Sequence, residues 1–292
     1  MAEFVPLTPG THRRTINVDG RERTYLLHAP PSYDAGRTYP LLLAFHGGAT
    51  DAAFMARFCG LNEKSDEAGF LVIYPNGTGE VSRLLTWNAG NCCGYARRQN
   101  IDDVQFVNAI LDEASRSAAI DERRIYATGM SNGAMMSYRL AAELSERIAA
   151  IAPVAGTMAL DAFAPDRPVP VIHFHGTEDD YVPFDGGRGP LSLSQNHFAS
   201  VAESIRRWAD FNGCRPDPTI TDLPNVAADG LAIECREYTG GRDGTEVVLY
   251  VVAGGGHTWP GRESRITALG PSTLSISAND LMWEFFVRHP LR

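Results

Sequence analysis

The chain has 292 residues, of which 44% are hydrophobic, an ordinary composition for a globular protein near the upper size limit of one hydrophobic core. Its 26 basic and 35 acidic residues give a formal net charge of −9 without long blocks of like charge, which argues against nucleic acid or an anionic membrane as a partner. No apolar run approaches the ~20 residues of a membrane-spanning helix, so no membrane partner is expected.

The N-terminal segment, "MAEFVPLTPG", lacks a basic stretch followed by an apolar stretch, so no signal peptide is expected in the sequence. We expect residues 1–11 to be a flexible segment and residues 1–292 to form a single domain. The next stretch, "HRRTINVDGRERTYLLHAP", predicts a β-hairpin around Asp19-Gly20, because this dipeptide is a strong turn signal.

Buried strands and amphipathic helices then alternate along the chain. "YPLLLAFHGG" and "FLVIYPNGTG" predict strands, and "DAAFMARFCGLNEKSDEAG" between them predicts one helix that closes at Gly69. "IDDVQFVNAILDEASRSAA" predicts an amphipathic helix, which is followed by a strand at residues 124–128.

The C-terminal half continues the same alternation. "RIAAIAPVAG", "VPVIHFHG" and "EVVLYVVAGGGH" predict strands, whereas "FASVAESIRRWADFNG" and "ISANDLMWEFFVRHP" predict helices, the last ended by Pro290. This pattern predicts an α/β protein with a mostly parallel central sheet and helices on both faces. Ligand sites in such sheets lie at the carboxyl ends of the strands.

A serine marks one of the changes from strand to helix. Ser131 lies between Gly129 and Gly133 in "RIYATGMSNGAMMSYRLAAELS", where the hydrophobic period changes from two to about 3.6. A turn this sharp brings the backbone on its two sides together, so a Cβ at either glycine would clash. The pattern is the G-x-S-x-G nucleophile elbow of the α/β-hydrolase fold, and Ser131 is the candidate nucleophile. A glycine-containing loop without chemistry is the alternative.

The two partners of a catalytic serine are expected downstream, in the order acid and then histidine. Glu178, Asp179 and Asp180 follow the strand "VIHFHG", and Asp179 is the preferred acid over Asp180. His257 follows another strand through three glycines, which allow the loop to bring its ring back over the sheet edge. A solvated acidic loop and a loop histidine without function are the alternatives.

An acyl-transfer site also requires donors for an oxyanion. The N–H of Asn132, directly after the nucleophile, is one candidate, and the loop "FHGGAT" supplies the other from Gly48 or Ala49. His46 in the same loop is a candidate substrate contact.

The positions of the five cysteines predict one disulfide bond. Cys214 and Cys235 flank a loop rich in Pro, Asp and Asn, and a disulfide between them would staple this loop. Cys92 and Cys93 are adjacent, either as a vicinal disulfide or as thiols. No zinc spacing accompanies the cysteines, so no metal site is expected.

Several stretches together resemble a known family. "PLLLAFHGG", "LVIYPNGTG", "TWNAGNCCG", "IDDVQFV", "HGTEDDYVP" and "GGGHTWPG" resemble, in order and spacing, the polyhydroxybutyrate depolymerase-like and feruloyl-esterase-like hydrolases, which are related to carbohydrate esterase family one. The resemblance spans about residues 13–286. It implies that Ser131 is the nucleophile, Asp179 the acid and His257 the general base, with the oxyanion loop at residues 46–49.

The expected function is therefore that of a serine carboxylic-ester hydrolase without a metal or organic cofactor. Short-chain, aryl or hydroxycinnamoyl esters are the expected substrates, as small molecules or attached to a polymer. A polyester depolymerase, an acetylxylan esterase, an acyltransferase and a non-catalytic binding protein on this scaffold are the alternatives. Family members are usually exported, so a secreted or periplasmic location is expected, with a cytoplasmic one as the alternative. The oligomeric state is not predicted.

The shape of the site is the last expectation. Only about a dozen residues, "GTMALDAFAPDR", lie between two of the strands where a cap is commonly inserted, which is too short for a cap domain. This segment is expected to form one wall of an open cleft. Trp259 and, by the family resemblance, Trp87 are expected near the cleft as flat apolar surfaces for substrate, with core packing as the alternative.

Overall fold

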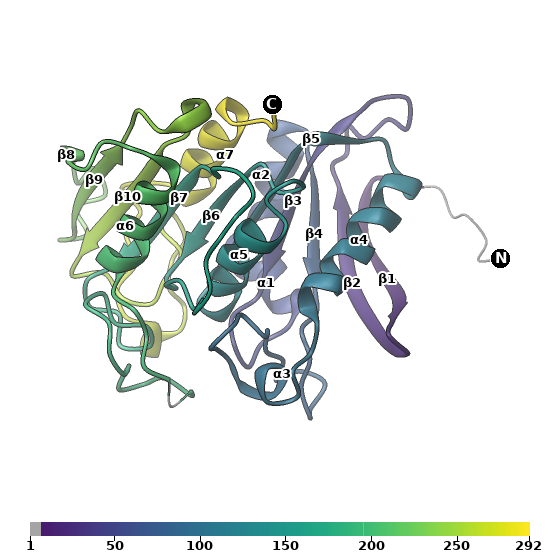
Figure 1. The fold of residues 1–292 in the computed structure, drawn as a ribbon, viewed down its shortest axis with the longest axis horizontal. Helices are drawn as coiled ribbons and strands as arrows, with labels where there is room; N and C mark the ends of the chain where they lie inside the picture. The colour runs from purple at the N-terminus through teal and green to yellow at the C-terminus, as the bar shows by residue number, and fades with distance from the viewer. Residues whose placement is uncertain (1–6, 195) are drawn as a thin grey trace.

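One sheet of ten strands organises the molecule, and the computed structural model describes residues 7–194 and 196–292 (Figure 1). The strand order is β1-β2-β4-β3-β5-β6-β7-β10-β9-β8. The six central strands run parallel to one another: β4 (Leu71–Pro75), β3 (Tyr39–Phe45), β5 (Ile120–Met130), β6 (Ala150–Val154), β7 (Val171–Gly176) and β10 (Val247–Ala253). The predicted α/β-hydrolase fold, with a mostly parallel sheet, is thus confirmed.

The predicted hairpin forms one edge of the sheet. Strands β1 (Gly10–Val18) and β2 (Arg21–Ala29) pair antiparallel, and the turn between them has positive φ at Asp19 (53°) and Gly20 (74°). Residues 1–6 of the segment expected to be flexible lie outside the described residues. Its end does not fit that expectation, because Leu7 is buried in the core and β1 already begins at Gly10.

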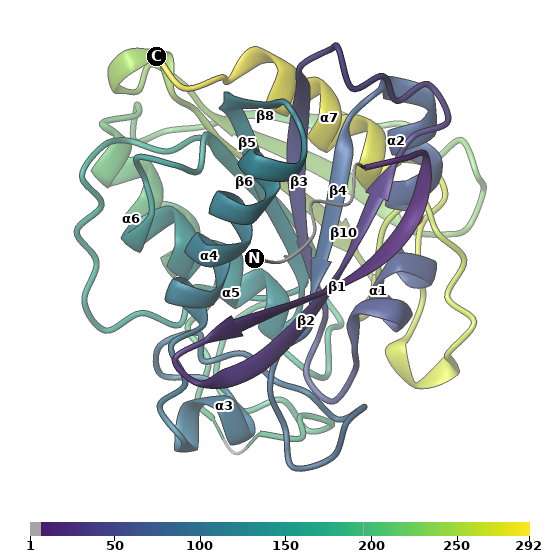
Figure 2. The ribbon, with the colours of Figure 1, turned by 90° about the vertical axis from the view of Figure 1, so that its right-hand side faces the viewer.

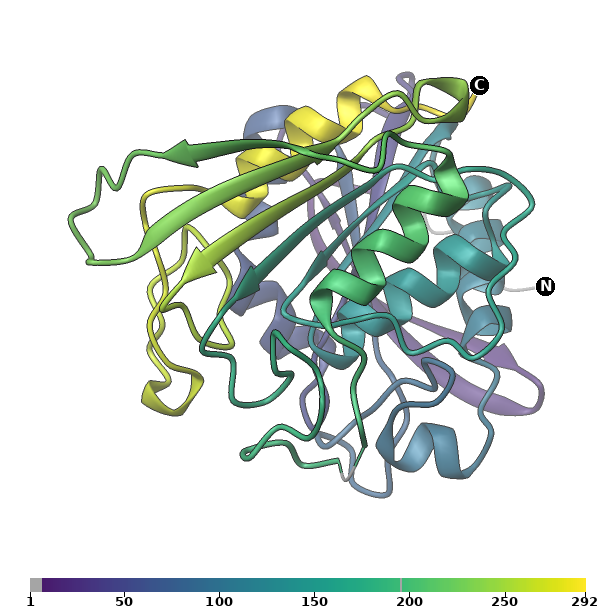
Figure 3. The same cartoon turned by 60° about the vertical axis from the view of Figure 1, so that its left-hand side comes forward.

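A second antiparallel hairpin forms the opposite edge (Figure 3). It consists of β9 (Ala232–Tyr238), which pairs with β10, and the outermost strand β8 (Thr219–Leu223). Sequence patterns indicated only a loop here, because β8 is solvent-exposed along nearly its whole length and lacks the apolar run of a buried strand.

Helices cover both faces of the sheet, as Figure 2 shows edge-on. One face holds α4 (Asp103–Ser117), α5 (Asn132–Glu143) and α6 (Val201–Asn212), and the other holds α1 (Ala52–Cys59), α2 (Leu61–Ala68) and α7 (Ala278–Arg288). The single helix expected over residues 51–69 is two helices, because Gly60 between them has left-handed φ (66°). Short helical turns occur at α3 (Gly94–Arg98), η1 (Arg242–Gly244) and η2 (Thr267–Leu269).

Two hydrophobic cores result from this arrangement, one on each face. Along β3, Leu41 and Leu43 pack in the core with α4 and α6, whereas Leu42 packs in the core with α1 and α7. The alternation follows from the pleat of a strand that is buried on both sides.

The connection between β6 and β7, residues 155–170, contains no helix or strand, so it holds no cap domain. The long loops lie instead after β4, β7 and β10, and they gather at the carboxyl ends of the parallel strands, at the bottom of Figure 1. In the part of the chain that the structure describes, no helix is long and apolar enough to cross a membrane.

Candidate active site

Ser131 sits in a strained turn between β5 and α5, with φ 57° and ψ −121°. A Cβ added to Gly129 would meet Gly133 carbonyl atoms at 2.5 Å and Phe45 O at 2.8 Å, and one added to Gly133 would overlap Phe45 O. The reason predicted for both glycines, close approach of backbone, therefore matches this geometry. A side chain held at positive φ in such a turn is exposed rather than packed into the helix, and Ser131 lines a cavity.

Asp179 and His257 meet beside this cavity. Asp179 follows β7 and is buried, and its Oδ2 accepts a hydrogen bond from His257 Nδ1 (2.7 Å). The other carboxylate oxygen accepts the backbone N–H groups of Tyr181 and Val182, each at 2.8 Å. Asp180 is exposed. Of the two neighbouring acids, the structure thus brings only Asp179 to the histidine.

Backbone contacts hold the acid loop and the histidine loop together. The N–H of Glu178 donates to Gly255 O (2.9 Å), and the N–H of Gly254 donates to Thr177 Oγ1 (2.9 Å). Gly176 at the end of β7 is required because the loop before His257 runs against it, and a Cβ there would meet Gly256 O at 2.6 Å; a Cβ on Gly256 itself would overlap Leu269 O. This close approach places the imidazole over the end of β7.

Burial and the neighbouring histidines shift the pKa of Asp179 in opposite directions. Burial by itself raises the pKa of Asp179, but the positive charge of His257 and hydrogen bonds from His175 and His257 outweigh it, so that its pKa lies below the ordinary range. Asp179 is therefore an anion at neutral pH, as is required of a group that orients a neutral imidazole and stabilises an imidazolium.

A buried chain of polar groups continues from Asp179 into the core. His175 Nε2 lies 3.4 Å from Asp179 Oδ2 and donates to Val182 O (2.9 Å). His175 Nδ1 pairs with His173 Nε2 (3.0 Å), and His173 Nδ1 pairs with the Tyr138 hydroxyl (2.8 Å).

This chain has only one consistent set of donors. Because His175 Nε2 faces a carbonyl and a carboxylate, it carries the proton, and His175 Nδ1 accepts from His173 Nε2. His173 Nδ1 then accepts from the hydroxyl of Tyr138. Burial and the neighbouring His175 hold the pKa of His173 well below its ordinary value, so the ring is neutral. Both histidine rings are buried behind the acid.

Two backbone amides converge near Ser131. Asn132 begins α5, where backbone N–H groups have no acceptor within the helix. A Cβ on Gly48 would lie 3.8 Å from Asn132 Cβ, and one on Gly47 would lie 3.5 Å from Ser131 Cβ, so the loop after β3 approaches both residues closely.

Of the two amides proposed from this loop, the structure leaves only one free. The N–H of Ala49 donates to Leu85 O (2.8 Å) and is therefore not available to a substrate. The N–H of Gly48 has no acceptor among the described residues. The expected choice between Gly48 and Ala49 thus resolves in favour of Gly48.

His46 supports this loop from behind and does not line the cavity. Its Nε2 accepts the N–H of Gly77 (3.0 Å) and its Nδ1 contacts Gly47 O (2.8 Å). Burial lowers the pKa of His46 to about 4, so the ring is neutral. The expectation of a substrate contact at His46 is therefore wrong, because its side chain is fully buried.

Trp87 is also a structural residue. Its backbone N–H donates to Asn132 Oδ1 (2.7 Å), its carbonyl accepts from Asn132 Nδ2 (3.1 Å), and its indole N–H donates to His46 O (3.0 Å). Its side chain is fully buried. Trp87 therefore ties the loop after β4 to both sides of the candidate oxyanion site.

Trp259 lies in the other core. Its exposed fraction is 1%, and its indole N–H donates to Asn279 Oδ1 on α7 (2.9 Å). Neither tryptophan lines the cavity, so the expected substrate contacts at Trp87 and Trp259 are corrected to core packing. In the core, the indole N–H has an acceptor and the apolar ring is removed from water.

The cavity has a volume of about 530 Å³ and is lined by both apolar and polar side chains. Apolar side chains from α1 and from the loop after β10 line it: Phe54, Met55, Phe58, Ile266 and Leu269. Polar and charged side chains come from α3 and from the loop after β7, which also contributes the apolar Leu193: Arg97, Arg98, Ser192, Ser194 and Asn196. Sequence reasoning missed both sets, although the basic pair in "GYARR" was a visible signal.

The expected wall from residues 156–167 is not there. None of these residues lines the cavity. Instead, Ala159 O accepts the N–H of Asn91 (2.8 Å), so the segment supports the loop after β4 from outside. The walls come from the longer loops after β4, β7 and β10.

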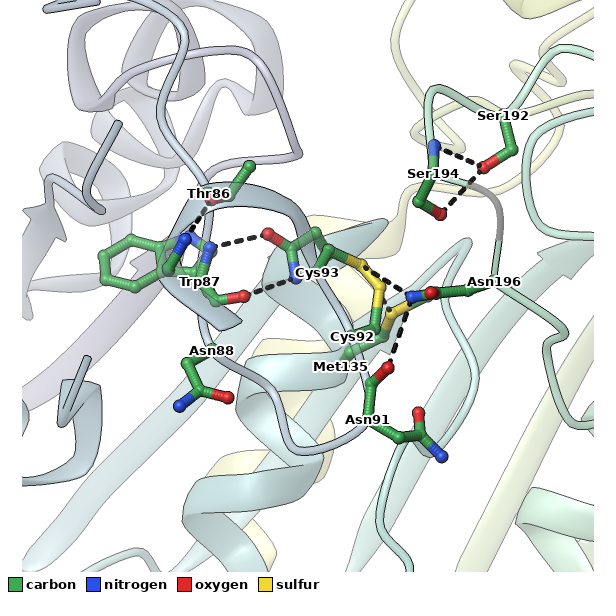
Figure 4. The surroundings of a disulfide bond; sticks show 12 residues. Thr86, Trp87, Asn88, Asn91, Cys92, Cys93, Met135, Ser192, Ser194 and Asn196 are labelled. Atoms are coloured by element: carbon green, nitrogen blue, oxygen red, sulfur yellow. Dashed lines mark hydrogen bonds between the residues drawn. A yellow bond between two sulfur atoms is a disulfide. The ribbon is translucent and has the colours of Figure 1, made fainter. Parts of the chain in front are cut away.

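The cysteines pair differently from the prediction. Cys92 and Cys93 form a vicinal disulfide (Figure 4). Cys214 and Cys235 are free thiols. Cys235 packs in the core that contains α1 and α7, whereas Cys214 packs against the core on the opposite face of the sheet. The predicted bond is therefore wrong, because the sheet separates the two thiols.

The disulfide lies in the wall of the cavity. Cys93 lines it, its N–H donates to Trp87 O (3.0 Å), and Asn196 Nδ2 approaches Cys93 Sγ (3.8 Å) (Figure 4). In the described residues, no cluster of three or more His, Cys, Asp or Glu side chains could hold a metal ion.

The sheet order, the turn at Ser131 and the buried Asp179–His257 pair define the protein as an α/β-hydrolase. Residues 23–182 match the family described as Esterase PHB depolymerase. The chain belongs to this family, and it is an enzyme that hydrolyses esters.

Individual relatives agree with this assignment. "Putative esterase NocK" of Nocardia uniformis subsp. tsuyamanensis is 32% identical over an alignment of 295 positions that covers 95% of this chain and 83% of that protein. "Feruloyl esterase B" of Piromyces equi is 30% identical over 80% of this chain, and the match spans 42% of its own length. Acetyl xylan esterase from Aspergillus awamori has the same fold, with a TM-score of 0.62 at 15% identity over 94% of this chain and 99% of that one.

Proposed function

We propose that the protein is a serine carboxylic-ester hydrolase in which Ser131 is the nucleophile, His257 the general base and Asp179 the acid that orients it. The observation that carries the proposal is that Ser131, in its strained turn, lines the same cavity as His257, whose Nδ1 is bonded to buried Asp179 (2.7 Å). His257 Nδ1 is then the donor to the carboxylate, which leaves Nε2 free to accept a proton.

The reaction proceeds through an acyl-enzyme. His257 Nε2 takes the proton of Ser131 Oγ as the oxygen attacks the ester carbonyl, and it returns this proton to the departing alcohol. The oxyanion accepts hydrogen bonds from the amides of Asn132 and Gly48, which are held in place before substrate arrives. Water activated by the same imidazole then releases the acid. No step requires a metal or an organic cofactor.

The proposed substrates are short-chain, aryl and hydroxycinnamoyl esters, free or attached to a polymer. The cavity of about 530 Å³ is large enough for an aromatic acyl group, and Phe54, Phe58 and Leu269 supply apolar surface for it. Two relatives named feruloyl esterases, from Piromyces equi and Neurospora crassa, support the hydroxycinnamoyl part of the proposal at 30% and 27% identity.

A hydrolysis panel tests the proposal. Purified protein is given methyl ferulate, aryl acetates, acetylated xylan and a hydroxybutyrate oligomer, and the acids released are quantified with and without an added alcohol acceptor. We expect acid from the ferulate and the aryl acetates, at rates that Ser131→Ala abolishes. Release from the hydroxybutyrate oligomer alone, or ester formation that exceeds hydrolysis, would contradict it.

Export from the cytoplasm is part of the proposal. The Cys92–Cys93 disulfide supports it, because such bonds persist in oxidising compartments and are rare in the cytosol. Fractionation of cells that produce the protein from its own gene tests this, and activity confined to the cytosol would contradict it.

A further inference from the structure

The charged residues of the cavity have one sign. Arg97 and Arg98 on α3 line it, and no carboxylate is among the described residues that do so. The whole chain carries a formal net charge of −9, so a cavity free of acids departs from the rest of the molecule. Walls of low dielectric that carry charge of one sign concentrate the field inside a cleft.

The two arginines are not equivalent. Arg98 lies 3.5 Å from Glu80 Oε1, which neutralises part of its charge. The guanidinium of Arg97 forms no ion pair or hydrogen bond with the part of the chain that the structure describes. The backbone of Arg97 is fixed by its N–H, which donates to Cys93 O (3.3 Å) beside the disulfide.

Neutral polar side chains also line the cavity. Ser192 and Asn196 do so from the loop after β7, and Figure 4 shows Asn196 beside Cys93. Asn196 Nδ2 already donates to Asn91 O (3.3 Å) and approaches Cys93 Sγ (3.8 Å), so its N–H groups are occupied within the protein. The guanidinium of Arg97 is therefore the group of the cavity that matches a carboxylate, which Arg binds through two parallel N–H groups.

We propose that the cavity binds a carboxylate group of the ester substrate, with Arg97 as its principal cationic partner. The inference rests on the proposed hydrolase function and adds a substrate class to it, namely esters that carry a negative charge on the acyl or the alcohol half. Ser131 and Arg97 line the same cavity, so one substrate can contact both. The apolar side chains of the cavity then contact the uncharged half.

Matched pairs of esters that differ only in charge test this. 3-Acetoxybenzoate and 3-acetoxybenzamide vary the alcohol half, and the monomethyl esters of 4-carboxycinnamic and 4-carbamoylcinnamic acid vary the acyl half. At low salt we expect kcat/KM to favour the carboxylate in at least one pair by about fivefold, the upper end of the scale for an ion pair with an exposed side chain such as Arg97. The preference should shrink as salt is raised.

Arginine variants test which residue binds the carboxylate of the substrate. Arg97→Gln should reduce the preference to less than twofold, and Arg98→Gln should have the smaller effect; the ratio within each pair cancels any effect that a variant has on both esters alike. Arg57→Gln is the matched control, because Arg57 is an exposed arginine in the last turn of α1 that does not line the cavity. Equal rates within both pairs, or a preference that persists in Arg97→Gln, would overturn the inference. Absence of turnover of all four esters together with no fluorophosphonate labelling would instead refute the hydrolase function itself.

The buried chain behind Asp179 carries a second inference independently. We infer that His175 is a positioning residue, whose Nε2–H fixes the acid loop so that Asp179 Oδ2 meets His257. The side chain of His175 does not line the cavity; its Nε2–H donates to Val182 O (2.9 Å) and lies 3.4 Å from Asp179 Oδ2, so it acts through the loop that carries the acid. Tyr138 and His173 fix the tautomer that presents this proton, because each acceptor in the chain is already occupied by a donor.

Three substitutions of His175 test this role. His175→Leu removes the donor, His175→Gln keeps an N–H near Nε2, and His175→Asn keeps only the position of Nδ1. We expect kcat to fall about tenfold or more in the leucine variant with KM within twofold of the wild type, and the glutamine variant to recover part of the loss. Wild-type kcat in the leucine variant would overturn the inference. If that variant does not fold, a glutamine variant no faster than the asparagine variant overturns it equally.

Discussion

Ser131 is the single residue whose removal should separate chemistry from folding. Ser131→Ala deletes Oγ but keeps the turn that Gly129 and Gly133 permit, so the thermal midpoint should be unchanged. We expect kcat for aryl acetates to fall on the order of 10⁵-fold, because members of a triad act as a unit. A fluorophosphonate should label the wild type at Ser131 alone. Labelling of the alanine variant would contradict the assignment.

The neighbouring acids offer a matched comparison at the residue scale. Asp179→Asn removes the anion that accepts from His257 Nδ1, whereas Asp180→Asn alters an exposed side chain. We expect a fall in kcat of about 10⁴-fold for the first change and less than twofold for the second, because an amide at 179 orients the wrong tautomer of the imidazole. Steady-state kinetics of both variants decides this. A larger loss at 180 would reverse the roles.

Asp179 also affects stability at acidic pH. Its folded-state pKa lies below the ordinary value of about 3.9, so its charge contributes free energy of folding above that pH, and the contribution is lost as the pH falls towards the folded-state pKa. We expect the free energy of unfolding of the wild type to decrease more steeply below about pH 4 than that of Asp179→Asn. Denaturant titrations at a series of acidic pH values measure both slopes. Parallel curves would show that the acid is not stabilised by its partners.

At the scale of elements, one buried ion pair joins the N-terminal hairpin to α4. Arg23 on β2 contacts Asp103 at 2.7 Å with both side chains buried, and the other oxygen of Asp103 accepts the N–H of Asn88 (2.8 Å). This carboxylate therefore also anchors the loop that contains Trp87. Burial raises the pKa of Asp103, so its charge depends on these partners.

The adjacent aspartate provides the control for this pair. Asp103→Asn leaves Arg23 buried without a counterion, and we expect a loss of about 3 kcal/mol in the free energy of unfolding. Asp102→Asn should cost less than about 0.5 kcal/mol, because asparagine also caps a helix and can accept the N–H of Gln105. Chemical denaturation of both variants measures the difference. Equal losses would mean that the pair contributes nothing specific.

The features of these elements that the sequence predicts depend on residues that are close together in the chain. The elbow at Ser131, the acid after β7 and the histidine after β10 all follow from short patterns of glycines and strand ends, and the structure brings Asp179 and His257 together as expected. The parallel strands were predictable for the same reason, since continuous apolar runs are typical of a sheet buried on both faces.

What depends on distant contacts was not predictable. The indole of Trp87 is buried because it contacts His46 O, and that of Trp259 because it contacts Asn279, and neither partner is near in sequence. The free Cys214 and Cys235 follow from their positions on opposite faces of the sheet. The register of β9, which pairs Cys235 with Tyr250, determines the face on which Cys235 lies. The sequences of β8 and β9 contain no apolar pattern strong enough to predict these strands.

At the scale of the whole molecule, the absence of a cap between β6 and β7 sets the response to insoluble substrates. Residues 155–170 contain no helix or strand that could move as a lid. We expect activity on short-chain and aryl esters, little on long-chain triglycerides, and a rate that rises smoothly through the solubility limit. Kinetics on either side of that limit test this. A steep increase above it would indicate a lid elsewhere in the loops.

Because Asn132 and Trp87 form two hydrogen bonds, the walls of the cavity differ in how far their sequence can change without loss of activity. The loop after β4 contains Trp87, whose backbone N–H and carbonyl hold the side chain of Asn132 in place. A relative with a different loop there must therefore keep both hydrogen bonds to remain active. The wall at residues 262–270 has no such connection to Asn132 among the described contacts, but its end supports the histidine loop, since the N–H of Gly256 donates to Pro271 O (2.9 Å) and a Cβ on Gly256 would overlap Leu269 O. Substrate range in this enzyme can therefore diversify by insertion and deletion within residues 262–268, provided that the segment at 269–271 still holds the glycine before His257.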